Sequence, residues 1–78
     1  MNNRDNIDHH LSQAYSHIEQ ALDLSIEEYK RIKQSQEALG RQWEEFLGRV
    51  YHAIKEKGKA NRINLLGWIS FSRLRKWL

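Results

Sequence analysis

The chain contains no cysteine and no proline in its 78 residues. Without cysteine it forms no disulfide bond and no thiolate metal site, and its redox compartment is left undetermined. Proline and glycine are the strongest interrupters of helices, and only four glycines are present. The other residues are rich in Glu, Gln, Lys, Arg, Ala and Leu, which favour helix. The sequence therefore predicts an all-α fold.

Long apolar runs are also absent. No stretch approaches the roughly 20 apolar residues that a membrane-spanning helix needs. The polar residues 1–5 lead into no apolar core of a secretory signal, so we expect a cytoplasmic protein. A chain of 78 residues is expected to form a single small domain, in the size range where isolated domains are only marginally stable.

Catalytic and metal-binding arrangements are missing as well. The serines lie in no nucleophile motif, and there is no glycine-rich loop that would hold a phosphate. The four histidines include no pair three or four residues apart, the spacing that brings two ligands together on a helix. We therefore expect a protein that is not an enzyme, with no catalytic residues, no metal, no cofactor and no small-molecule substrate.

What the sequence does contain is an apolar stripe at helical spacing. Its positions follow one another in steps of three or four, which places them on one side of an α-helix. They are Ile7, Leu11, Ala14, Ile18, Leu22, Ser25, Tyr29, Ile32, Gln36, Leu39, Trp43, Phe46, Val50 and Ile54. The stripe predicts a long helix over about residues 6–57, after a disordered segment 1–5. A helix of that length, roughly 75 Å at 1.5 Å per residue, cannot bury its own stripe, so it must fold back on itself or bind another chain.

Two positions are candidate breaks in this helix. Ser25 begins a Ser-Ile-Glu-Glu sequence that fits a capping box, which would start a second helix there. The stripe keeps its phase through Ser25, however, so we expect the helix to continue. Gly40 weakens a helix by about 1 kcal/mol relative to alanine without stopping it, which leaves a bend there as the alternative.

The stronger helix stop is the sequence around Gly58. Lysines gather before this glycine, which stands where a C-terminal capping residue is expected. We expect a linker over residues 58–61, with Asn61 capping the element that follows. Residues 62–78 form a basic, aromatic segment that we expect to be a short helix. Alternation of apolar residues from Ile63 to Phe71 leaves a strand as the alternative.

Charge is distributed unevenly along the chain. Residues 1–28 hold six acidic residues against Arg4, a net charge of −5, whereas residues 29–78 hold twelve basic residues against four glutamates, a net charge of +8. An acidic front and a basic rear favour antiparallel packing, either of the chain on itself or of two copies head to tail. The alternative is that both halves are simply solvated.

The stripe also fits a heptad pattern with unusual residues at its seam. Tyr, Trp, Gln and Ser at seam positions suit an irregular bundle or a recognition surface better than a two-stranded zipper. We therefore expect contact with a protein partner or with further copies of the chain. Aromatic residues are enriched where proteins bind one another, and the residues expected to bind the partner are Tyr29, Trp43, Phe46, Val50, Trp68, Phe71 and Trp77.

The C-terminal segment admits several interpretations. Its basic residues are Arg62, Arg73, Arg75 and Lys76, and together with its aromatic residues they resemble the mixture that binds nucleic acid. The same mixture suits a helix at a membrane surface. The segment could instead only complete a core against the first helix. The leading hypothesis is a non-enzymatic helical interaction module, that is, an inhibitor, adaptor or assembly factor. Nucleic-acid binding by the basic half and peripheral membrane binding by residues 62–78 are the alternatives.

Overall fold

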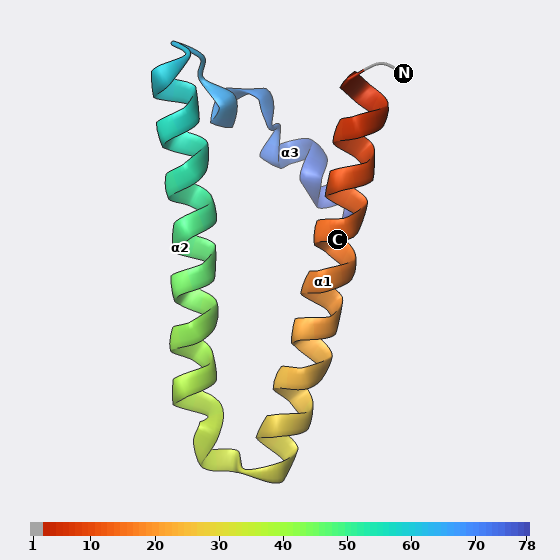
Figure 1. The fold of residues 1–78 in the computed structure, drawn as a ribbon, viewed down its shortest axis with the longest axis vertical. Coiled ribbons are helices and arrows are strands. Elements are labelled where there is room, and N and C mark those ends of the chain that lie inside the picture. The colour runs from red at the N-terminus through yellow and green to blue at the C-terminus, as the bar shows by residue number, and fades with distance from the viewer. Residues whose placement is uncertain (1–2) are drawn as a thin grey trace. The chain divides into compact units, whose positions relative to one another are not determined.

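The computed structural model describes residues 3–78, with the side chain of Phe71 outside that description, and every regular element in this range is helical (Figure 1). The elements in chain order are α1 (Asn3–Arg31), η1 (Lys33–Ser35), α2 (Gln36–Ala60), η2 (Leu65–Trp68), α3 (Phe71–Leu74) and η3 (Arg75–Trp77). The predicted all-α fold is confirmed, with a long helix (α2) and a short C-terminal helix (α3). The chain divides into two compact units, Met1–Gly40 and Arg41–Leu78, and each is described by itself.

The first unit consists mainly of α1. Asp5 lies in the first turn of α1 and Lys30 and Arg31 in the last, so charges of both signs complement the helix dipole. The helix begins at Asn3, three residues before the expected start. Ser25 lies inside α1, where its hydroxyl donates to the Ala21 carbonyl at 2.7 Å. Continuity through Ser25 is confirmed, and the capping alternative is wrong because the hydroxyl is bonded to the preceding turn of the same helix.

The long helix predicted over residues 6–57 is interrupted at Ile32–Ser35, between the two candidate breaks. Ile32 donates its amide to Glu28 at 2.8 Å, which ends α1, and its backbone is extended, with φ −136° and ψ 101°. The Ile32 carbonyl then accepts from the Ser35 amide at 3.0 Å and from the Ser35 hydroxyl at 2.6 Å. Serine competes with the helix for local backbone groups in this way, and a new helix follows. Gly40 lies within continuous α2, so no break occurs there.

In the second unit, α2 ends in a Schellman motif two residues beyond Gly58. Ile63 donates its amide to the Gly58 carbonyl at 2.8 Å, and Arg62 donates to the Lys59 carbonyl at 3.2 Å, the two bonds that define this motif. The left-handed position is taken by Arg62, with φ 56°, and not by a glycine. Gly58 therefore lies inside α2. The helix ends two residues later, at Ala60, and not at Gly58 as expected.

The segment after α2 forms separate short turns instead of one helix over residues 62–78. Asn61 donates its side-chain amide to the Lys57 carbonyl at 2.8 Å, so it caps the end of α2 and not the start of the next element. The Asn64 side chain accepts from the Gly67 amide at 3.2 Å, and the Ser70 hydroxyl accepts from the Arg73 amide at 3.3 Å. These polar side chains begin η2 and α3 respectively, which divides the segment.

The described residues bury almost nothing. No apolar side chain described in either unit is buried, and Gly58 is the only described residue that is. Each unit, taken by itself, therefore has no apolar core. None of the helices in the described part of the chain is long and apolar enough to cross a membrane.

Candidate interaction surfaces

The apolar face of α1 is made of large side chains that its own unit leaves uncovered. Ile7, Leu11, Leu22 and Tyr29 are all exposed, and only Ile18 among the large stripe residues of α1 is half-buried. These positions recur every three or four residues, so they share one side of the helix. Tyr29, the residue of α1 expected to bind a partner, lies at the C-terminal end of this face, one turn before Ile32. Most of the face is apolar, with the Ser25 hydroxyl and the Tyr29 phenol as its polar groups.

The apolar face of α2 contains the other stripe residues expected to bind a partner. Trp43 and Phe46 contact each other edge to face, with ring centroids 6.0 Å apart and ring planes at 87°. This is a favoured geometry for aromatic pairs because the positive edge of one ring meets the negative face of the other. Val50, one turn further on, is exposed beside them. The structure thus brings Trp43, Phe46 and Val50 onto one face of a single helix.

The exposed apolar surface of α2 extends beyond the residues of the predicted stripe. Leu47 and Tyr51 lie beside the stripe and are both more than half exposed, at 58% and 53%. The ammonium group of Lys55 lies 5.7 Å from the centre of the Tyr51 ring, a cation–π contact. Sequence reasoning left these residues out because it followed steps of three and four along one line. The signal was present, since Leu47 and Tyr51 are themselves four residues apart.

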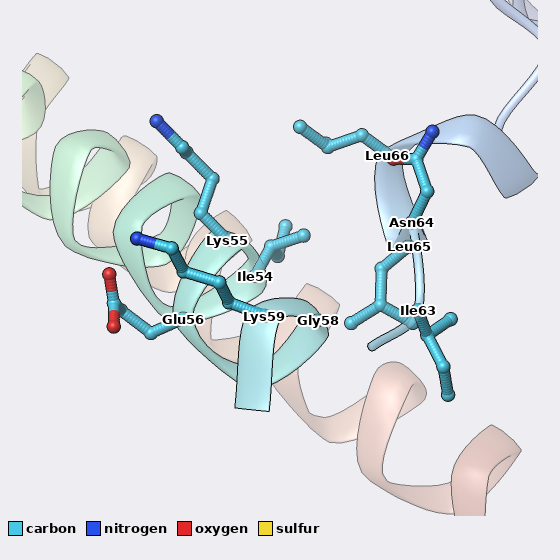
Figure 2. Close-up of a pocket in the computed structure, with 9 residues that line it drawn as sticks. All are labelled: Ile54, Lys55, Glu56, Gly58, Lys59, Ile63, Asn64, Leu65 and Leu66. Atoms are coloured by element: carbon cyan, nitrogen blue, oxygen red, sulfur yellow. The ribbon is translucent and has the colours of Figure 1, made fainter. Parts of the chain in front are cut away.

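A hollow of about 350 Å³ lies between the end of α2 and the residues that follow it (Figure 2). A β-carbon added at Gly58 would lie 2.5 Å from the Ile63 carbonyl oxygen and 3.6 Å from Leu65 Cγ, so the chain passes close over this glycine. Apolar residues and lysines line the hollow together; the lining residues are Ile54, Lys55, Glu56, Gly58, Lys59, Ile63, Asn64, Leu65 and Leu66. In Figure 2, the side chains of Lys55 and Lys59 extend from the helix away from Ile63, Leu65 and Leu66. Sequence reasoning missed this hollow because it forms only where the Schellman turn brings the chain back.

The C-terminal segment presents the most exposed aromatic residues of the second unit. Trp68 in η2 is 71% exposed and Trp77 in η3 is 86% exposed. The basic residues Arg73, Arg75 and Lys76 are exposed beside them, on α3 and η3. Phe71, which was also expected to bind a partner, has a side chain outside the described part. Arg62, the fourth basic residue named from the sequence, is exposed, and its left-handed backbone takes part in ending α2.

Polar chemistry is sparse on these surfaces. Arg31 binds the Oε1 atom of Glu28 through Nε at 3.1 Å and through an Nη atom at 2.7 Å, at the end of α1. Both side chains are well exposed, and such ion pairs contribute well under about 1 kcal/mol. Within the described residues there is no group of three or more His, Asp or Glu side chains that could hold a metal ion.

Comparisons of the chain with protein-family models, with curated proteins and with solved structures found no match. The function is therefore argued from the surfaces of this chain alone.

Proposed function

We propose that this protein is a non-enzymatic helical interaction module, acting as an inhibitor, adaptor or assembly factor in the cytoplasm. It self-associates or docks on a larger protein through the apolar faces of α1 and α2. The observation that carries the proposal is the exposure of large apolar side chains along both helices, with none buried among the described residues of either unit. Contiguous apolar surface of this kind is rarely left in water and marks a contact site.

The residues that anchor this contact are Tyr29 on α1 and Trp43, Phe46 and Val50 on α2. Aromatic residues carry a large share of the binding free energy in protein interfaces because each buries much apolar area at a small entropic cost. The paired rings of Trp43 and Phe46 are already in a favoured geometry, so less order has to be imposed on binding. The uneven charge supports an antiparallel arrangement, with the acidic residues 1–28 against the basic residues 29–78.

Sedimentation equilibrium of the full chain tests this proposal, with Val50→Asp and His52→Asp as a matched pair. The two residues are two positions apart on α2. At about 3.6 residues per turn, they therefore lie on nearly opposite sides of the helix. Val50 is on the apolar face and His52 is not. We expect the unchanged chain and His52→Asp to form a dimer or larger oligomer, and Val50→Asp to weaken this association at least tenfold.

Two results would overturn the proposal. One is a well-ordered monomer that also captures no larger protein in a pull-down from its host. The other is an equal loss of association in Val50→Asp and His52→Asp, because the apolar face would then have no special part in it.

Nucleic-acid binding by residues 29–78 is less well supported. The net charge of +8 favours contact with phosphates, whose affinity would fall steeply with salt. However, Glu37, Glu44, Glu45 and Glu56 lie among the basic residues of α2 and would repel a phosphate backbone. No recognition motif accompanies the charge, so we do not put this function first.

A further inference from the structure

The end of α2 and the residues after it carry positive charge without any acidic residue. Beyond Glu56 the basic residues are Lys57, Lys59, Arg62, Arg73, Arg75 and Lys76, and residues 57–78 contain no Asp or Glu. All six of these basic residues are exposed. Because no carboxylate within the segment neutralises them, this surface attracts an anionic partner.

The same segment exposes aliphatic as well as aromatic side chains. Ile63, Ile69 and Leu74 are each more than two-fifths exposed, and Trp68 and Trp77 in the same segment are still more exposed. Bases stack on aromatic rings, but aliphatic side chains gain little from that contact. Aliphatic side chains gain free energy when they enter acyl chains, and tryptophan is enriched at the boundary between headgroups and acyl chains. The combination favours a lipid surface over nucleic acid.

Several backbone amides of the segment make local hydrogen bonds. Ile69 donates to the Leu66 carbonyl at 3.2 Å, and Leu74 donates to the Ser70 carbonyl at 3.0 Å. Backbone groups without partners are costly in an apolar medium, and these bonds remove that cost for the amides of Ile69 and Leu74. Lysine and arginine can bury their apolar stems there and keep their charges at the headgroups.

The hollow at the end of α2 adds to this surface. Its lining includes the apolar residues Ile54, Leu65 and Leu66 together with Lys55, Glu56 and Lys59 (Figure 2). The apolar residues of this lining can accept part of an acyl chain. Leu65 and Leu66 lie on the same stretch of chain that carries the exposed tryptophans.

We infer that residues 57–78, with Lys55 of α2, bind the surface of a membrane that contains anionic phospholipid. Trp68, Leu74 and Trp77 enter the interface, and the surrounding Lys and Arg side chains contact the headgroups. This assigns Trp68 and Trp77 to lipid instead of to a protein partner. The binding does not depend on the self-association proposed above, which uses the faces of α1 and α2.

Flotation of the full chain with vesicles tests the inference. Vesicles of phosphatidylcholine alone are compared with vesicles that also contain phosphatidylserine, at low and high salt. We expect the chain to float with the anionic vesicles only and to be released by salt. Each basic residue near an anionic surface raises the partition coefficient about fivefold, so Arg73→Gln/Arg75→Gln/Lys76→Gln lowers it about 100-fold. The matched triple Lys30→Gln/Lys33→Gln/Arg49→Gln, which removes the same charge elsewhere, lowers it far less.

A second pair of variants tests the apolar part. Trp68→Ser/Trp77→Ser abolishes flotation, whereas Leu24→Ser/Ile26→Ser, which changes two exposed apolar residues of α1 outside the stripe, leaves it unchanged. Tryptophan fluorescence shifts to the blue with anionic vesicles, and the shift survives Trp43→Phe. Equal binding to neutral vesicles would overturn the inference. So would equal effects of the two charge triples, or binding to single-stranded or duplex oligonucleotides without flotation, which would assign the surface to nucleic acid.

Discussion

At the scale of single residues, Gly58 is the most constrained position among those described. It is buried although it has no side chain, because the chain returns over it and Ile63 donates its amide to the Gly58 carbonyl. The other two glycines of α2, Gly40 and Gly48, have no atom within 4 Å of the place where a β-carbon would stand. Of the three glycines of α2, only Gly58 is therefore in a place where a side chain would meet other atoms.

We predict opposite effects of alanine at Gly58 and at Gly48. Gly58→Ala places a β-carbon 2.5 Å from the Ile63 carbonyl oxygen, a backbone atom that cannot move without opening the Schellman turn. Overpacking of this kind typically costs about 1–3 kcal/mol. Gly48→Ala gains about 0.5–1 kcal/mol because alanine restricts the unfolded chain and meets open space in the helix. Urea unfolding followed by far-ultraviolet circular dichroism measures both changes, and a stabilising Gly58→Ala would contradict the described turn.

At the scale of elements, the interruption at Ile32–Ser35 separates what the sequence could predict from what it could not. Helix content was predictable because breakers are few and apolar residues recur at helical spacing. The interruption was not found from that spacing, because Ile32 and Gln36 stand where the next stripe positions would be. Charged residues were the sequence feature that indicated the interruption. Lys30 and Arg31 in the last turn of α1 mark the end of one helix, and Glu37 in the first turn of α2 marks the beginning of the next.

The candidate surfaces were predictable to a similar degree. Trp43, Phe46 and Val50 were found from periodicity, because a helix fixes which residues share a face. The hollow at Gly58 was not found from the sequence. It depends on the left-handed backbone of Arg62, and nothing about an arginine in the sequence indicates that conformation. The division of residues 62–78 into short turns also depended on local side-chain bonds from Asn64 and Ser70 that compete with a continuous helix.

We predict that proline is tolerated at Lys33 and not at Ser25. Lys33 is the first residue of η1 and follows the extended Ile32, a position that suits proline and its predecessor. Ser25 is inside α1, where proline removes a helical hydrogen bond and costs about 3 kcal/mol or more. Circular dichroism should show nearly unchanged helix content for Lys33→Pro and a clear loss for Ser25→Pro. Lys33→Ala serves as the control for the lost charge, and equal losses for both proline variants would mean that the helix is unbroken at residue 33.

At the scale of the whole molecule, the feature that matters is apolar surface that neither unit, taken by itself, buries among its described residues. Large apolar side chains are exposed on α1, on α2 and after α2, and none is buried among those described. Hydrophobic burial is the main favourable contribution to folding, so a unit that lacks it is only marginally stable alone. In the function proposed above, binding to a partner or to another copy adds the burial that each unit does not supply by itself.

We therefore predict that stability depends on protein concentration. When a protein associates only in its folded state, association raises the apparent stability by mass action. The thermal midpoint should rise by several degrees when the concentration of the unchanged chain is raised about a hundredfold, and the rise should be smaller for Val50→Asp. Scanning calorimetry and circular dichroism at matched concentrations measure this. A midpoint that is independent of concentration would argue against association between copies.

The burial of Gly58 also has a consequence for how this sequence can drift over generations. At the exposed positions, the local fold tolerates most exchanges, so apolar residues along α1 and α2 persist only if selection from outside the chain retains them. Gly58 differs, because its own backbone turn requires the absence of a side chain. In related sequences that no longer bind a partner, we therefore expect substitutions to remove the apolar residues of the stripe first and to leave Gly58 unchanged.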